Sequence, residues 1–129
     1  MRSTPRPVTE PVSAPDGSDP VKRGAFLVNL AGCRDCHTPL DHGEPIASLD
    51  FAGGQVFEGP WGKVVSANLT PGPSGIPYYD EALFMQAIRT GYVQKRSLNQ
   101  IMPWRHYGGM TDDDLKAIFA YLKTLKPLN

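Results

Sequence analysis

The residues best suited to chemistry lie together in the short stretch Cys33-Arg34-Asp35-Cys36-His37, which contains both cysteines of the chain. Two cysteines at this spacing support three kinds of chemistry. A redox dithiol places its first cysteine at the start of a helix in a thioredoxin-like βαβ unit. A structural zinc site requires four ligands, usually in two pairs. Covalent haem attachment uses both thiols on the haem vinyl groups and the adjoining histidine as the proximal ligand of the iron.

The surroundings of the motif favour haem attachment. A helix rather than a strand is expected before Cys33, which does not fit the dithiol setting. Only His42 and His106 could add to a zinc site, and the chain has no second close pair of ligands. We therefore predict one covalent haem c, attached through Cys33 and Cys36, with His37 as an axial ligand of its iron.

The second axial ligand of an electron-carrying haem is commonly a methionine. Met85 falls inside a predicted helix, where packing is the simpler role. Met102 lies in a long loop, and the proline after it keeps it out of a helix. Met110 lies in the same loop but directly precedes a helix cap, where it could pack on Leu115 instead. We predict Met102 as the sixth ligand, with Met110 as the alternative.

The two remaining histidines are weaker candidates for the iron. His42 is too near His37 in the chain to reach the opposite face of the haem easily. His106 follows Met102 by four residues and is a lesser rival. We expect it to be a polar surface residue or a neighbour of the site rather than a ligand.

The length of 129 residues is enough for one domain. Its 13 glycines and 13 prolines predict a loop-rich structure, whose small core needs a bound group to complete it. The formal net charge is zero, so no overall field points to nucleic acid or to a membrane surface. The N-terminal stretch lacks a hydrophobic signal segment, and no apolar run approaches transmembrane length.

The N-terminal residues 1–18 are rich in proline and poor in apolar side chains. Such a segment cannot bury enough surface to offset the entropy of ordering. We interpret it as a flexible tail or linker, which could tether residues 19–129 to a membrane anchor or to another domain. Residues 19–129 are predicted to form the functional domain.

Three helices are predicted in that domain. The first starts at Asp19-Pro20 and ends near Gly32, with Val21, Ala25 and Val28 facing a partner, and with Phe26 and Leu27 as further candidates for that face. The second covers residues 80–90 and stops at Gly91. The third follows the cap Thr111 and has apolar residues at helical spacing. The connection 38–79 lacks periodicity apart from a strand-like run at 63–66, so we expect it to wrap around something.

Taken together, these features resemble the class I c-type cytochromes over residues 20–126. The segments "RGAFLVNLAGCRDCHTP", "SANLTPGPSGI", "AIRTG" and "MPWRHYGGMTDDDLKAIFAYLKTL" carry the resemblance. They are most similar to the haem modules in cytochrome subunits of bacterial membrane-bound dehydrogenases. Those modules commonly have Gly-Ile-Gly and a nearby tryptophan where this chain has Gly75-Ile76-Pro77-Tyr78-Tyr79.

The resemblance implies an all-α class I cytochrome c fold, with three or more helices and long loops wrapped around one covalent haem. In that fold the first and last helices cross. The resemblance also implies His37 and Met102 as the axial ligands. Because bacterial haem c is attached outside the cytoplasm, it implies a periplasmic or membrane-tethered location.

The expected function is one-electron transfer in a respiratory chain, not enzymatic catalysis, since nothing else in the sequence forms a catalytic constellation. The alternatives are a haem module of a larger oxidase or dehydrogenase subunit, and a ligand-binding haem sensor or enzyme with an open sixth position. Expected partners are a donor dehydrogenase or cytochrome and an acceptor oxidase or reductase. Between residues 82 and 111 the charged side chains are all basic, and could form a docking surface for an acidic partner: Arg89, Lys95, Arg96 and Arg105.

Overall fold

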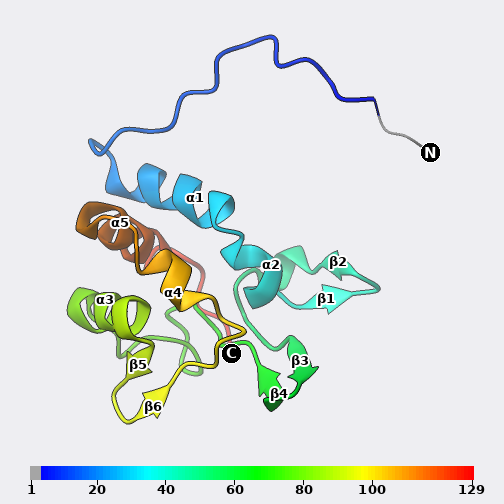
Figure 1. Cartoon of the computed structure of the whole chain (residues 1–129), viewed down its shortest axis with the longest axis vertical. Coiled ribbons are helices and arrows are strands. Elements are labelled where there is room, and N and C mark those ends of the chain that lie inside the picture. The colour runs from blue at the N-terminus through cyan, green and yellow to red at the C-terminus, as the bar shows by residue number, and fades with distance from the viewer. Residues whose placement is uncertain (1–3) are drawn as a thin grey trace.

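The frame of the domain is a pair of crossing helices from the two ends of the chain. The computed structural model describes residues 4–129. Helix α1 (Pro20–Leu30) packs against α5 (Asp112–Leu122), and α3 (Glu81–Thr90) packs against α5 on another side (Figure 1). The short helices α2 (Cys33–His37) and α4 (Trp104–Tyr107) follow α1 and precede α5. The crossing of the first and last helices, which the resemblance implied, is confirmed.

Local capping explains where α1 begins. The Asp19 carboxylate accepts a hydrogen bond from the Lys22 N–H at 3.1 Å, and Pro20 occupies the first turn, as predicted. The expected packing face is wrong in part, because Val21 is 39% exposed. The buried residues are Gly24, Leu27 and Val28, of which only Gly24 was not expected on this face. The reason is that α1 approaches α5 at a glycine, which a search for apolar side chains does not detect.

The two other long helices also have side-chain caps. Asp80 accepts the Leu83 N–H at 2.7 Å to start α3, and Gly91 ends that helix with a φ of 71°. Thr111 accepts the Asp114 N–H at 3.2 Å to start α5. The Asp114 carboxylate does not complete a capping box, because it binds the Arg23 guanidinium with an N–O distance of 3.0 Å. This ion pair joins the starts of α1 and α5.

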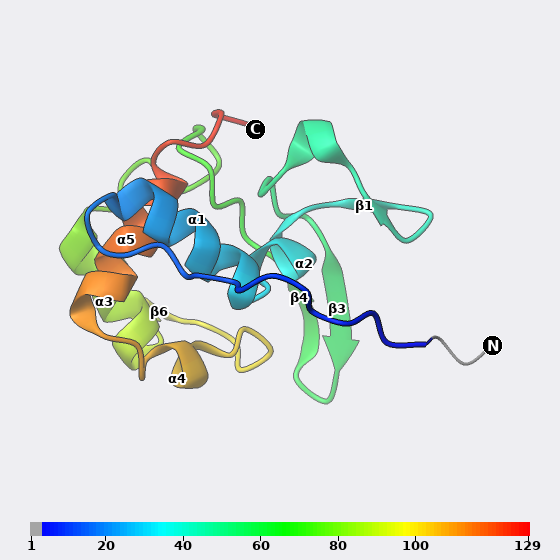
Figure 2. The same cartoon turned by 90° about the horizontal axis from the view of Figure 1, so that it is seen from above.

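Within residues 4–129 the loops contain three two-stranded antiparallel hairpins, where only one strand-like run was expected. The hairpins are β1 (Leu40–Asp41) with β2 (Glu44–Pro45), β3 (Val56–Gly59) with β4 (Gly62–Val65), and β5 (Tyr92–Val93) with β6 (Arg96–Ser97). Figure 2 shows the first two hairpins beside the helices. A 3₁₀ turn, η1 (Ala47–Leu49), lies between the first two. These hairpins are short decorations on a helical fold.

The core lies where α1, α3 and α5 meet. Its buried side chains come from all three helices and from one loop residue: Leu27, Val28, Phe51, Phe84, Ile88, Leu115, Ile118, Phe119 and Leu122. The long connection 38–79 is held against the C-terminal segment by hydrogen bonds that join Thr70 and Asn68 to Leu128. Residues 4–14 form no helix or strand and are exposed; residues 1–3 of the predicted tail lie outside the described residues.

Candidate functional site

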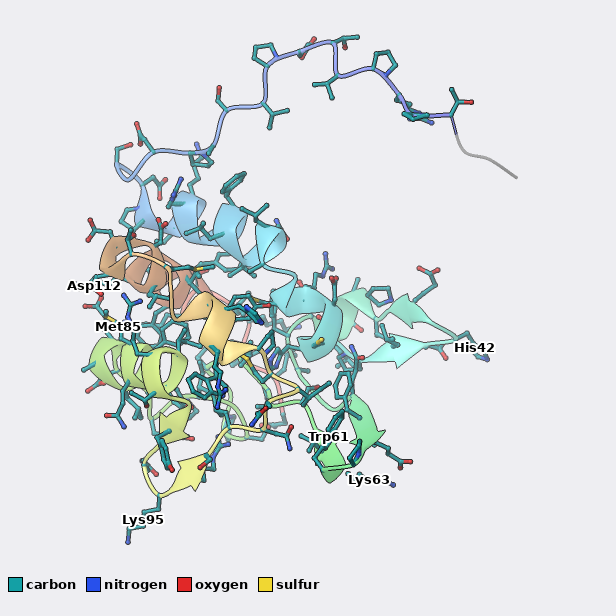
Figure 3. All side chains as sticks on the ribbon, viewed as in Figure 1. His42, Trp61, Lys63, Met85, Lys95 and Asp112 are labelled. Carbon is teal, nitrogen blue, oxygen red and sulfur yellow. The ribbon has the colours of Figure 1, made fainter. Side chains whose placement is uncertain are left out.

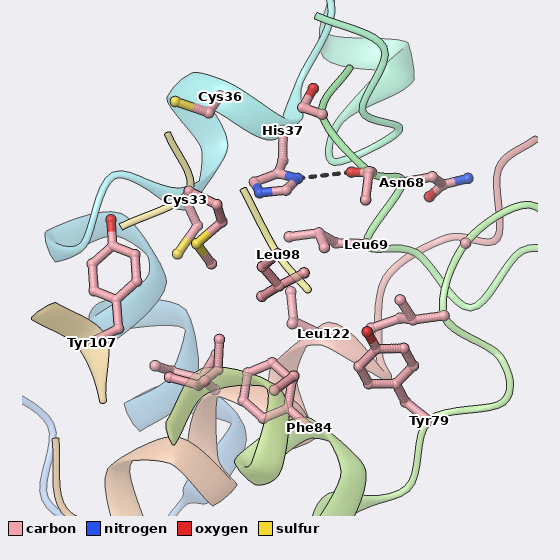
Figure 4. Close-up of a pocket in the computed structure, with 18 of the residues that line it drawn as sticks. Cys33, Cys36, His37, Asn68, Leu69, Tyr79, Phe84, Leu98, Tyr107 and Leu122 are labelled. Carbon is pink, nitrogen blue, oxygen red and sulfur yellow. Dashed lines mark hydrogen bonds between the residues drawn. The ribbon is translucent and has the colours of Figure 1, made fainter. Parts of the chain in front are cut away.

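A cavity of about 590 Å³ opens beside the core and brings the predicted site residues together. Cys33, Cys36 and His37 line one part of it. Met102 and Met110, from the loop before α5, line it as well. Figure 4 shows the His37 ring and the Cys33 side chain directed toward this space, with Cys36 on the same short helix. Residues 60 or more positions apart in the sequence therefore share one site.

The two cysteines occupy one short helix but differ in environment. Cys33 is half-buried and Cys36 is exposed, and they form no disulfide with each other. Burial raises the pKa of the Cys33 thiol to about 11. A nucleophilic dithiol instead needs a thiolate stabilised by a lowered pKa. The environment of Cys33 therefore does not fit redox dithiol chemistry.

His37 is buried and held in one orientation. Its Nδ1 lies 2.7 Å from the carbonyl oxygen of Ala67, the dashed contact in Figure 4. A carbonyl only accepts, so Nδ1 carries the proton and Nε2 is left free to bind a metal. Burial lowers the pKa of the imidazole, which keeps it in the neutral form that ligates iron. Ala67 belongs to the long connection, and nothing in the sequence pattern marked it as a partner of His37.

The long connection also fixes the end of α2. The Gln55 side-chain amide donates to the carbonyl oxygens of Asp35 and Thr38, and Gly53 N–H donates to the His37 carbonyl at 2.7 Å. Gly53 has a φ of 70°, and a Cβ there would lie 2.4 Å from the Ala67 backbone. Close approach of backbone to backbone thus requires glycine at this point. The wrapping loop orients the cysteine motif.

Both candidate methionines are half-buried against the core and both line the cavity. Met102 lies outside any helix, in the turn in which its N–H donates to the Asn99 carbonyl at 3.1 Å. Met110 directly precedes the capping residue of α5. Met85 is also packed against the core but is not among the cavity-lining residues. The fold therefore brings two methionines to the site.

The other histidines lie away from the cavity wall. His42 is at the tip of the β1–β2 hairpin, where its ring pairs with Asp41 at 2.7 Å and 94% of its side chain is exposed (Figure 3). His106 is exposed on α4. Among residues 4–129, no three side chains of His, Cys, Asp or Glu gather as a metal-binding group.

The cavity fits a large apolar ring system. Apolar side chains from α3 and α5 form much of its wall: Phe84, Ala87, Ile88, Leu115, Ile118 and Leu122. Folded domains rarely contain large voids, because the atoms lining a void lose their packing contacts. A covalently attached haem would fill this space and complete the core, with Cys33, Cys36 and His37 positioned to hold it.

Comparison with known proteins agrees with the site. The family model described as Cytochrome c matches residues 21–126. The chain is 37% identical over 111 residues to the cytochrome c subunit of quinone alcohol dehydrogenase from Komagataeibacter europaeus, covering 84% of this chain and 22% of that protein. It is 34% identical over 124 residues to the fructose dehydrogenase cytochrome subunit of Gluconobacter japonicus, covering 94% and 24%.

A third relative is the gluconate 2-dehydrogenase cytochrome c subunit of Pantoea cypripedii, 36% identical over 103 residues, covering 78% of this chain and 22% of the relative. The chain therefore belongs to the cytochrome c family, with covalent haem c as its cofactor and electron transfer as its function. It spans less than a quarter of the length of each of these three relatives.

Proposed function

We propose that this chain is a monohaem electron-transfer domain with haem c bonded to Cys33 and Cys36, and with His37 and Met102 as axial ligands of the iron. The observation that carries the proposal is the apolar cavity of about 590 Å³, which these four residues line together. The bound haem supplies an iron that cycles between the ferrous and ferric states. The apolar wall limits water around it, and the Ala67 carbonyl keeps His37 in the ligating tautomer.

The domain serves, in this proposal, a dehydrogenase outside the cytoplasm. The relatives are cytochrome subunits of alcohol, fructose and gluconate dehydrogenases. The domain would accept electrons from a dehydrogenase catalytic subunit and pass them to a further carrier or oxidase, without catalysing the substrate reaction itself. Bacterial haem c attachment places it in the periplasm or on the periplasmic face of a membrane. In residues 4–129, no helix is long and apolar enough to cross a membrane.

The docking surface that we propose is smaller than the sequence predicted. Arg96 lines the cavity, Lys95 projects from the adjoining hairpin, and Arg105 is exposed on α4. Arg89 is left out because its guanidinium binds Asp112 at 2.6 Å and main-chain carbonyls of the loop. The remaining three cations form the part of the surface suited to an acidic partner.

Absorption spectroscopy of the purified protein and two methionine variants tests the proposed ligand set. Reduced protein should show a low-spin haem c spectrum, and oxidised protein the weak methionine–iron band. Met102→Ala should lose that band, become high-spin and bind carbon monoxide when reduced, because its sixth position is open. Met110→Ala should retain the band and serves as the matched control.

Three results would overturn this assignment at different levels. An unchanged spectrum in Met102→Ala, with the band lost in Met110→Ala, would move the sixth ligand to Met110. A colourless protein with two titratable thiols would end the haem proposal altogether. A wild-type protein that binds carbon monoxide readily would favour the sensor or enzyme alternative instead.

A further inference from the structure

The C-terminal end of α3 holds the methionine-bearing loop at a point near Met110. The Arg89 guanidinium donates to the Met110 carbonyl at 2.6 Å, to the Gly108 carbonyl, and to the Asp112 carboxylate at 2.6 Å. Only 32% of the Arg89 side chain is exposed. A planar guanidinium with several donors is suited to binding several fixed acceptors at once. Three acceptors within five residues are thereby fixed to one helix.

A second contact holds the same loop near Met102. Gly91, the residue that ends α3, has a backbone that lies directly against the Trp104 ring: a Cβ at this position would come within 2.4 Å of it. Trp104 is tied to Met102 in turn, since the Trp104 N–H donates to the Met102 carbonyl at 2.8 Å. The glycine also has a φ of 71°, which disfavours other residues. The contact between residue 91 and the Trp104 ring is thus possible only because residue 91 is a glycine.

We infer that the end of α3 is a positioning element for the sixth-ligand side of the haem site, with Arg89 and Gly91 as its positioning residues. This inference rests on the proposed function. The two contacts lie at opposite ends of residues 102–110, so together they set how far either methionine can move from the cavity. Ligation by a thioether tolerates little displacement, because the sulfur must stay within bonding distance of the iron. Arg89 therefore acts through the loop and not by touching the haem.

The test compares variants in the full-length, haem-loaded protein. Arg89→Gln removes the charge and most of the donors, and should reduce the methionine–iron band of the oxidised protein and lower the reduction potential, since methionine ligation raises it. Arg89→Lys keeps the charge but not the planar fork, and should fall between Arg89→Gln and wild type. Gly91→Ala should displace Trp104 and reduce the band more than Arg89→Gln, because it acts at the Met102 end.

The matched control is Arg23→Gln, which breaks the Arg23–Asp114 ion pair at the start of α5 and removes none of the acceptors that Arg89 binds. It should lower the melting temperature but leave the methionine–iron band and the potential unchanged. If Arg89→Gln behaves like Arg23→Gln, losing stability with the band and potential intact, Arg89 is a structural residue only and the inference is wrong. A larger band loss in Arg89→Gln than in Gly91→Ala would keep the positioning element but assign its ligand as Met110.

Hydrogen exchange separates this inference from the proposed ligand set. Amides of residues 104–112 should exchange roughly tenfold faster in Arg89→Gln than in wild type, the scale expected for losing charge-assisted hydrogen bonds. Arg23→Gln should leave them unchanged. If wild-type protein lacks a methionine–iron band, the His/Met proposal fails, while exchange still decides whether Arg89 holds the loop. Unchanged exchange in Arg89→Gln would overturn the inference whatever the ligand.

Discussion

Among the single residues of the cavity, Tyr79 shows how the site alters acid–base behaviour. Burial, reinforced by the neighbouring Tyr78, raises the pKa of the Tyr79 phenol to about 12. The two rings lie with centroids 4.9 Å apart, and the Arg96 cation acts in the opposite direction, since it favours the phenolate. The native fold therefore retains a proton that an unfolded tyrosine loses near its ordinary pKa of about 10.

This difference predicts an alkaline loss of stability. Between about pH 10 and pH 12 the unfolded state binds fewer protons than the native state, so the free energy of unfolding falls as the pH rises. Below about pH 10 the contribution of Tyr79 is fully present. Urea unfolding of wild type and Tyr79→Phe across this range measures it, and the phenylalanine variant should lose less stability. Parallel stability curves for the two proteins would contradict the prediction.

The charge of Arg96 allows a second test of the raised pKa of Tyr79. Because Arg96 lowers the pKa of Tyr79, Arg96→Gln should shift the tyrosinate absorbance of that residue to higher pH. The difference spectrum between each protein and its Tyr79→Phe derivative isolates the one phenol. Lys95→Gln, next in sequence on the exposed hairpin, is the control for a general charge effect.

At the scale of helices, the contact between α1 and α5 depends on Gly24. A Cβ on this residue would lie 2.0 Å from the Ala117 carbonyl oxygen. The obstructing atom is backbone in the middle of α5, so it cannot move aside as a flexible side chain could. The crossing that frames the haem site therefore exists at this separation only with glycine at position 24.

Gly24→Ala sets two effects against each other. Alanine favours a helix over glycine by about 1 kcal/mol, whereas overpacking a core contact costs about 1–3 kcal/mol and sometimes more. Because the clash is with backbone, we expect the free energy of unfolding to fall by about 2 kcal/mol. Chemical denaturation measures the change. Gly17→Ala is the control, since nothing lies within 4 Å of a Cβ there; equal stabilities for the two variants would refute the close-approach argument.

Across the whole molecule, the net charge of zero conceals an uneven distribution. Several surface cations are neutralised within the domain by ion pairs, as Arg23, Arg34 and Arg89 are. Lys95 projects from the β5–β6 hairpin, far from α1 in the view of Figure 3. Of the cations proposed for docking, Arg96 lines the cavity, and Lys95 precedes Arg96 in the same hairpin.

This distribution predicts salt-dependent electron transfer with anionic reagents. Oxidation of the reduced protein by ferricyanide should slow several-fold as ionic strength rises from about 10 mM to about 500 mM, because salt screens attraction at the exposed cations. Lys95→Gln and Arg105→Gln should each weaken that dependence. Lys22→Gln, on the exposed face of α1, should not. A rate that does not respond to salt would remove the docking surface from the proposal.

Features that depend only on residues close together in the chain could be predicted from the sequence alone. The ends of the three long helices were predicted because each depends on a residue beside the helix: Asp19, Gly91 and Thr111 act on backbone groups within a few positions. The haem motif was readable for the same reason, since Cys33, Cys36 and His37 act as a unit within five residues. The apolar spacing of the last helix likewise marked its buried face.

Tertiary structure decided whatever depends on contacts between distant segments. The bond of His37 to Ala67, the close approach at Gly24 and the three acceptors of Arg89 join residues that no local pattern connects. Of the hairpin strands only β4 was expected, from the run at 63–66, because strands of two to four residues carry too little periodicity to detect. Met102 and Met110 reach the same cavity because the end of α3 contacts their loop at Met110 and at Trp104. Those contacts come from residues outside the loop, so the loop sequence alone does not reveal them.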